Sequence, residues 1–193
     1  MKKIVIAVII LIVLILLGIG FFVLNPKKAT QPSAASLLQE DTSQKNNTKT
    51  SAVIILSASK ASVKVGETFA VSVNISSRDA TGGTDIVILY DPTLVSVENN
   101  VSGAMNVGSI YHDYSINSDD KKGKITVSGI SSATEAPIAS GLFGTVTFKA
   151  IKPGKAEVKL DFTKGSTTDT NVISTKDLSD ILEAVQNVEV LIN

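Results

Sequence analysis

The sequence predicts an all-β domain that follows one N-terminal membrane-spanning helix. An apolar run over residues 4–24 predicts the helix, and a period-two alternation of apolar and polar residues from Val53 onward predicts the strands. The chain contains no cysteine, so disulfides and thiolate sites are excluded. The part after the linker, about 140 residues, is long enough to bury a core of its own.

Residues 4–24 contain only Ile, Val, Leu, Ala and Phe apart from Gly18 and Gly20, and they carry no charge. At about 1.5 Å per residue this run is roughly 31 Å long, which matches the hydrocarbon thickness of a bilayer. It is longer than the apolar core of a cleaved secretory signal, about 7–15 residues, and no small-x-small cleavage site follows it. We therefore expect an uncleaved signal anchor, with retention after export left open.

The charges that flank the span do not set its orientation, because a lysine pair precedes it and another follows it. Long domains translocate largely regardless of charge. We therefore expect residues 1–3 to be a cytoplasmic tail and the C-terminal domain to lie outside the cell membrane of a single-pass protein. Residues 25–51 are rich in Ser, Thr, Asn, Gln and Lys, which is typical of a flexible linker.

Residues 52–193 are expected to form the β domain. Phe69, Val71, Val73 and Ile75 alternate with small or polar residues, and further short apolar segments follow between turn residues. One of these expected strands covers residues 110–116. Residues 174–186 fit either a short helix or irregular strands, and the alternation over residues 188–192 favours strands. Many short strands at this spacing indicate a sandwich or a partly closed barrel.

Residues 85–98 read DIVILYDPTLVSVE, and this segment resembles the cohesin family, in which a strand ends in a Tyr-Asp-Pro turn before a Leu-x-x-Val strand. In the turn, Pro92 has a fixed φ, Asp91 can accept a local hydrogen bond and Tyr90 can cover the corner. Three other pieces keep the family's order. They are the alternating segment 63–73, the strand GTVTFKA at 144–150 and the terminal strand at 188–192.

The resemblance implies a jelly-roll sandwich of about nine strands, related to certain carbohydrate-binding modules. It also implies a non-catalytic receptor for a dockerin-like protein, as found on the bacterial surface in polysaccharide-degrading assemblies. In dockerin-binding members, acidic and amide residues on the strand before the turn face the partner. Asp85 falls on such a position, whereas Gly83 replaces the family's amide. Further candidates for partner contact, on the end of a neighbouring strand, are Ser128, Ser131 and Ser132.

The residues give little support to catalysis or to a cofactor. His112 is the only histidine, and no Gly-x-Ser-x-Gly elbow is present, so we expect no enzyme and no cofactor. Asp113, Asp119 and Asp120 could supply oxygen ligands for Ca²⁺, but their spacing matches no known calcium loop. Lys121 and Lys122 follow at once, so a solvated hairpin turn is favoured over a calcium site.

Two other partner classes can be weighed on composition. Residues 51–193 hold 16 acidic and 12 basic residues with no basic cluster, which argues against nucleic acid. Polysaccharide binding is the main alternative, although the chain has no Trp. Phe69, Phe148 and Phe162 are expected in the core, which leaves Tyr111, Tyr114 and Phe143 as exposed candidates for sugar contact. A second alternative is a structural subunit of an envelope complex.

Overall fold

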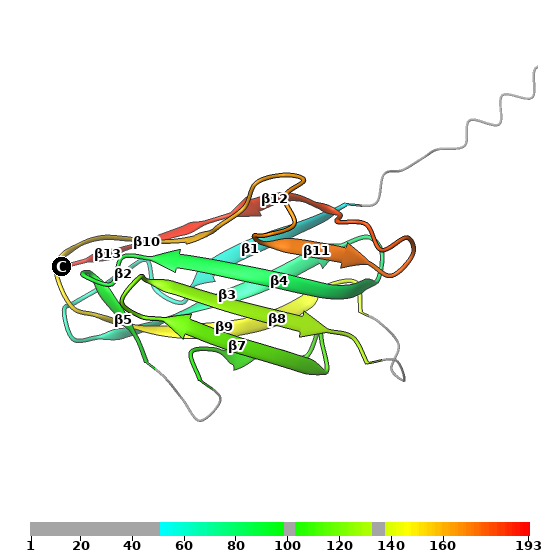
Figure 1. The fold of residues 1–193 in the computed structure, drawn as a ribbon. Coiled ribbons are helices and arrows are strands. Elements are labelled where there is room, and N and C mark those ends of the chain that lie inside the picture. Colours follow the sequence, from blue (N-terminus) through cyan, green and yellow to red (C-terminus); the bar gives the residue numbers. More distant parts are fainter. Residues whose placement is uncertain (1–50, 99–102, 133–137) are drawn as a thin grey trace, which may run out of the picture. The chain divides into compact units, whose positions relative to one another are not determined.

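The structure, a computed structural model, describes residues 51–98, 103–132 and 138–193 (Figure 1). These residues form an all-β sandwich of two sheets, which confirms the predicted fold class. The predicted span at residues 4–24, and the linker apart from Ser51, lie outside the described residues. Among the described ones, no helix is long and apolar enough to cross a bilayer.

The first sheet contains both the first and the last but one strand of the domain. β1 (Ala52–Ala58) pairs with β3 (Thr68–Ser77) in antiparallel fashion and with β12 (Leu182–Gln186) in parallel fashion. Among the described strands, the short strand β6 (Asn106–Val107) pairs only with β9 (Gly141–Ala150). In spatial order the strands are β12 (Leu182–Gln186), β1 (Ala52–Ala58), β3 (Thr68–Ser77), β9 (Gly141–Ala150) and β5 (Val95–Val97), with β6 at Asn106–Val107.

The second sheet contains the strand that leads into the Tyr-Asp-Pro turn. In spatial order its strands are β2 (Ser62–Val63), β13 (Val188–Ile192), β10 (Gly154–Leu160), β4 (Thr81–Tyr90), β8 (Lys124–Ile130) and β7 (Asp113–Asp119). β11 (Asn171–Ser174) also pairs with β4. β4 therefore has β8 along one edge, while β10 and β11 share the other edge.

The core lies between the two sheets and is filled as the alternation predicts. Phe69, Val71, Val73 and Ile75 are all buried on β3. The fully buried ring of Phe148 stacks on Phe69 at 5.6 Å between centroids and meets the edge of Tyr90 at 5.2 Å. The predicted core positions of Phe69 and Phe148 are confirmed, and Phe162 is partly buried against the same core.

The strand count and some strand bounds differ from the prediction. The described residues hold 13 strands instead of about nine, partly because two-residue pairings such as β2 and β6 have no recognisable alternation. Residues 174–186 contain β12 and a turn, with no helix, as the alternation favoured. The strand expected over residues 110–116 begins only at Asp113, because Ile110 and Tyr111 enter the core from the preceding loop.

The Tyr90-Asp91-Pro92 turn has the expected local bonds. Asp91 Oδ1 accepts hydrogen bonds from the Thr93 hydroxyl at 2.7 Å and from its backbone N–H at 2.8 Å. These bonds, the one from the hydroxyl above all, lower the pKa of Asp91. The turn between β7 and β8 packs on this corner at Gly123, whose φ is 61°. A Cβ there would lie 2.0 Å from the Tyr90 carbonyl oxygen, so only glycine fits this position.

Candidate partner-binding face

The candidate site is the outer face of the second sheet, where β11, β4, β8 and β7 lie side by side (Figure 1). Alternate residues of these strands point away from the core. Strand register places Asn171, Asp85, Ser128 and Ser115 in one row across the four strands. The face thus presents short polar side chains on a sheet.

Asp85 is the charged centre of this row and is held by both neighbours. The Ser128 hydroxyl donates to Asp85 Oδ1 at 2.5 Å, and Asn171 Nδ2 donates to Oδ2 at 3.2 Å. Asn171 is itself buried, and its Nδ2 also donates to the Asp169 carbonyl at 3.3 Å. A carboxylate has about four acceptor sites, so Asp85 can still accept bonds from a partner. The result is a half-exposed acceptor in one fixed orientation.

An apolar row lies beside this carboxylate. Register places Gly83 between Ile173 and Ile130, and Ile130 is 55% exposed. A hollow of about 180 Å³ adjoins Ile130 on the β7 side, between Ser115 and Ser128. Because Gly83 has no side chain, its position on β4 does not cover Ile130. The face therefore combines an oriented hydrogen-bond acceptor with an exposed aliphatic side chain.

The other predicted serines have different places. Ser128 lies on the face, where its hydroxyl donates to Asp85, and its role in partner binding stays a prediction. Ser131 lies past the end of β8, where its hydroxyl donates to the Thr81 carbonyl at 2.8 Å. Ser132 follows it and is half-exposed. Ser131 therefore ties β8 to the start of β4 and is not part of the row around Asp85.

The exposure predicted for Tyr111, Tyr114 and Phe143 is wrong. Phe143 is fully buried, Tyr111 is 5% exposed, and the half-buried Tyr114 packs its ring edge-on to Phe143 at 5.2 Å between centroids. The Tyr111 hydroxyl bonds Thr84 Oγ1 at 2.6 Å and donates to Thr81 Oγ1 at 2.8 Å. Tyr111 and Phe143 belong to the core and Tyr114 packs against it, so this cluster gives no exposed platform of aromatic rings for a sugar. Among the described residues no Phe or Tyr side chain is classed as exposed.

Tyr114→Phe is expected to stabilise the domain by about 1 kcal/mol. The Tyr114 hydroxyl is buried and has no hydrogen-bond partner among the described residues, and an unsatisfied buried hydroxyl carries an uncompensated desolvation cost. Urea unfolding of residues 51–193 followed by circular dichroism measures the change. Tyr111→Phe is the matched control and should destabilise, since it removes two hydrogen bonds. A loss of stability in Tyr114→Phe would contradict the prediction.

All three tyrosines ionise late in the folded domain. Burial above all raises the pKa of Tyr90 and of Tyr114 to about 12, and burial also raises the pKa of Tyr111. The folded-state pKa values thus exceed the unfolded value of about 10. Their contribution to stability is fully present below pH ~10 and is lost as pH rises from ~10 towards ~12. Tyrosinate absorbance should therefore rise together with loss of the β-sheet circular dichroism signal, and ionisation at pH ~10 in a folded domain would contradict this.

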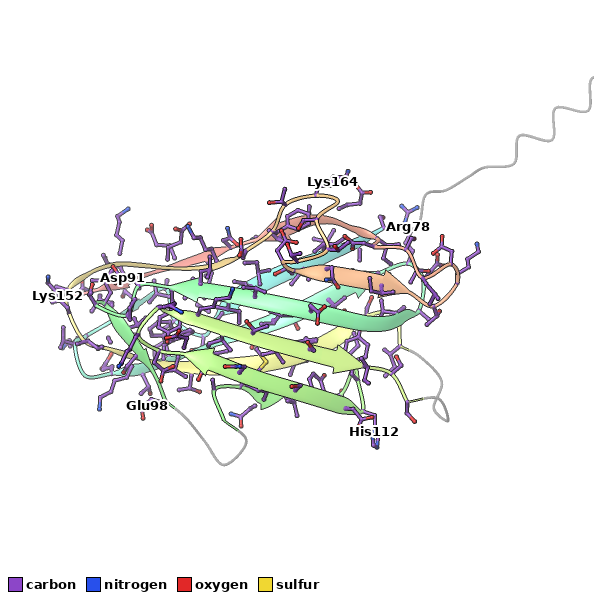
Figure 2. The ribbon with its side chains drawn as sticks, in the orientation of Figure 1. Arg78, Asp91, Glu98, His112, Lys152 and Lys164 are labelled. Carbon is purple, nitrogen blue, oxygen red and sulfur yellow. The ribbon has the colours of Figure 1, made fainter. Side chains whose placement is uncertain are left out.

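The aspartates considered for Ca²⁺ do not converge. Asp113 and Asp119 lie at opposite ends of β7, where Asp113 contacts His112 Nδ1 at 3.0 Å and Asp119 pairs with Lys122 at 3.0 Å. The Asp120 carboxylate accepts from the Tyr90 hydroxyl at 3.3 Å. The parts of the chain that the structure describes hold no group of three potential metal ligands. Figure 2 shows His112 at the edge of the domain, away from Asp91.

The described residues thus form a two-sheet β-sandwich whose second sheet carries polar and apolar side chains on its outer face. The sequence profile of the cohesin domain matches residues 54–190, more than half of the chain, so the chain belongs to the cohesin domain family. This confirms the resemblance seen at residues 85–98. Comparison with curated protein sequences gave no significant match.

Solved structures of cohesins share the fold. A type II cohesin from the cellulosome of Acetivibrio cellulolyticus has a TM-score of 0.61 at 19% identity, covering 72% of this chain and 95% of that one. A type I cohesin–dockerin complex from Clostridium thermocellum gives 0.58 at 20% identity, with 74% and 99% covered. A type II cohesin–X-dockerin complex from A. cellulolyticus gives 0.59 at 17% identity, with the same coverage.

The sequence missed Asn171, which orients Asp85 from the opposite side of β4. Asn171 lies 86 residues after Asp85 in the chain, and no sequence pattern indicates that the two residues are neighbours. The only sequence feature that indicates a strand start at Asn171 is the apolar pair Val172-Ile173 that follows it.

Proposed function

We propose that this chain is a non-catalytic receptor that binds a dockerin-type protein module through the outer face of β11, β4, β8 and β7. The observation that carries the proposal is the Asp85 carboxylate, which Ser128 and Asn171 hold in one orientation beside the exposed Ile130. Such a surface suits a helical partner that brings hydrogen-bond donors and a small apolar centre. Membership of the cohesin family and the cohesin–dockerin complexes among its structural relatives support the same partner class.

The test is direct binding of residues 51–193 to a panel of type I and type II dockerin modules by isothermal titration calorimetry. A saturable one-to-one complex with at least one module supports the proposal. Affinity electrophoresis on cellulose, xylan and chitin derivatives tests the polysaccharide alternative in parallel. Binding to polysaccharide without any dockerin binding would overturn the proposal, and retention by neither would favour the envelope-subunit alternative.

We also propose that residues 4–24 anchor the receptor in the cell membrane, with residues 1–3 inside and residues 25–51 as a spacer outside. The support is the uncharged apolar run and its length, which fits a single span. Protease added to intact cells should digest a C-terminal tag. A tag protected until the cells are lysed would overturn this topology.

A further inference from the structure

Leu178 combines two unfavourable features. It is 77% exposed, the largest exposed fraction among the large apolar side chains that are described, and its φ is 58°. It is the only described residue other than glycine with a positive φ. Leucine rarely adopts this left-handed conformation, because its Cβ crowds the following carbonyl oxygen. An apolar side chain in water and a strained backbone both work against stability, so Leu178 gives the folded domain nothing by itself.

The loop that carries Leu178 is held in place by its own hydrogen bonds. The Leu178 N–H donates to the Ser174 carbonyl at 3.2 Å, and the Ser174 N–H donates to the Ser179 carbonyl at 3.0 Å. Asp177 Oδ1 accepts from the Ser179 hydroxyl at 2.8 Å and from its N–H at 3.2 Å. Strain of this kind persists only where the surroundings determine the conformation, and it concentrates at functional positions. The side chain is therefore presented in a defined place.

This loop is attached to the candidate face. It follows β11, whose Asn171 donates to Asp85, and it is tied to the start of β4 because the Thr175 hydroxyl and N–H both donate to the Ala80 carbonyl, at 3.1 and 3.2 Å. Figure 1 shows the loop after β11 at the same end of the second sheet as the start of β4 and the end of β8.

Two other exposed aliphatic residues belong to segments attached at this same point. Ile130, 55% exposed, precedes Ser131, whose N–H and hydroxyl donate to the Gly82 and Thr81 carbonyls. Ile138, 42% exposed, has its carbonyl bonded by the Thr81 N–H and hydroxyl. Three separate segments thus bring exposed aliphatic side chains to the Ala80–Gly82 end of the sheet.

The chemistry of this end selects a protein partner. Aliphatic side chains lack the flat ring faces that stack on sugars. The loop over residues 175–180 carries Lys176 against Asp177 and Asp180, a net charge of −1, so it does not attract an anionic membrane surface. An apolar side chain of a protein fits both conditions.

We propose that Leu178 is an apolar contact residue for the dockerin-type partner, and that together with Ile130 it extends the Asp85 face beyond the start of β4. The inference rests on the proposed function and adds to it a specificity-determining position on the loop between β11 and β12. Binding buries the leucine and so uses the side chain that the free domain holds at a cost.

The test uses the full chain in mild detergent micelles and the dockerin modules of the type I and type II complexes described above. Leu178→Asn relieves the backbone strain, because asparagine tolerates the left-handed region, and it removes the apolar contact. We expect Kd to rise about 10-fold or more while Tm stays the same or rises by ~1–4 °C. Leu178→Met keeps an aliphatic side chain and should bind within about threefold of the original chain.

Ile151→Asn is the matched control. Ile151 is 47% exposed and precedes Lys152, which lies at the other end of the domain (Figure 2), so its Kd should not change. An unchanged Kd in Leu178→Asn overturns the inference and leaves the proposed function standing. A lower Tm in that variant also overturns it, since the residue would then be structural. If the original chain binds neither module, the proposed function fails and the inference fails with it.

Discussion

Asp85→Ala is expected to weaken binding of a dockerin-type module by about 10- to 100-fold. A hydrogen bond to a charged group contributes about 1.5–3 kcal/mol, which corresponds to that range of affinity. The carboxylate is already oriented by Ser128 and Asn171, so the partner does not have to immobilise it on binding. Titration calorimetry at neutral pH, with a module that the original domain binds, measures the change.

The fold should survive this substitution, because Asp85 lies on the outer face and Asn171 keeps its hydrogen bond to the Asp169 carbonyl. Glu98→Ala is the control: Glu98 is exposed and follows β5 of the other sheet (Figure 2), and its replacement should leave Kd unchanged. Asp85→Asn keeps the shape and removes the charge, so an intermediate loss is expected. An Asp85→Ala variant that binds within twofold of the original domain would show that the face around Asp85 is not the interface.

Much of the fold could be predicted because its central strands follow one rule. On β3 every second residue is buried, and such a strand with one buried face is visible in the sequence. The outward direction of Asp85 follows the same rule, since it stands an odd number of residues before the buried Tyr90, whereas its choice as a contact residue came from the resemblance to cohesins and stays a prediction. The Tyr-Asp-Pro turn also marked the end of β4 at Tyr90.

The surroundings of Asp85 could not be predicted, because they depend on pairings between distant segments. β11 has only four residues and no alternation, with three of its residues buried, so nothing in the sequence aligns Asn171 with Asp85. Tyr111 was placed on the surface for a related reason. Its loop turns the ring inward, where Thr81 and Thr84 satisfy the hydroxyl, and no periodicity records such a contact.

Phe148→Ala is expected to lower the free energy of unfolding by about 3–5 kcal/mol, the usual loss for a fully buried phenylalanine. Domains of this kind have only about 5–15 kcal/mol in total, so much of the stability would be lost. The ring lies on β9 between β3 and β5 and contacts both Phe69 and Tyr90. Urea unfolding of residues 51–193, followed by circular dichroism, measures the loss.

Phe162→Ala separates burial from residue type in the same experiment. Phe162 is only partly buried against the core, so its removal should cost about 1–2 kcal/mol. Equal losses for the two variants would contradict the central place given to Phe148. Phe148→Ala also has an indirect link to the candidate face, because Phe148 packs on Tyr90 at the end of the strand that carries Asp85. Partner affinity of the folded fraction should nevertheless stay close to that of the original domain, since Phe148 lies between the sheets and Asp85 on the outer face.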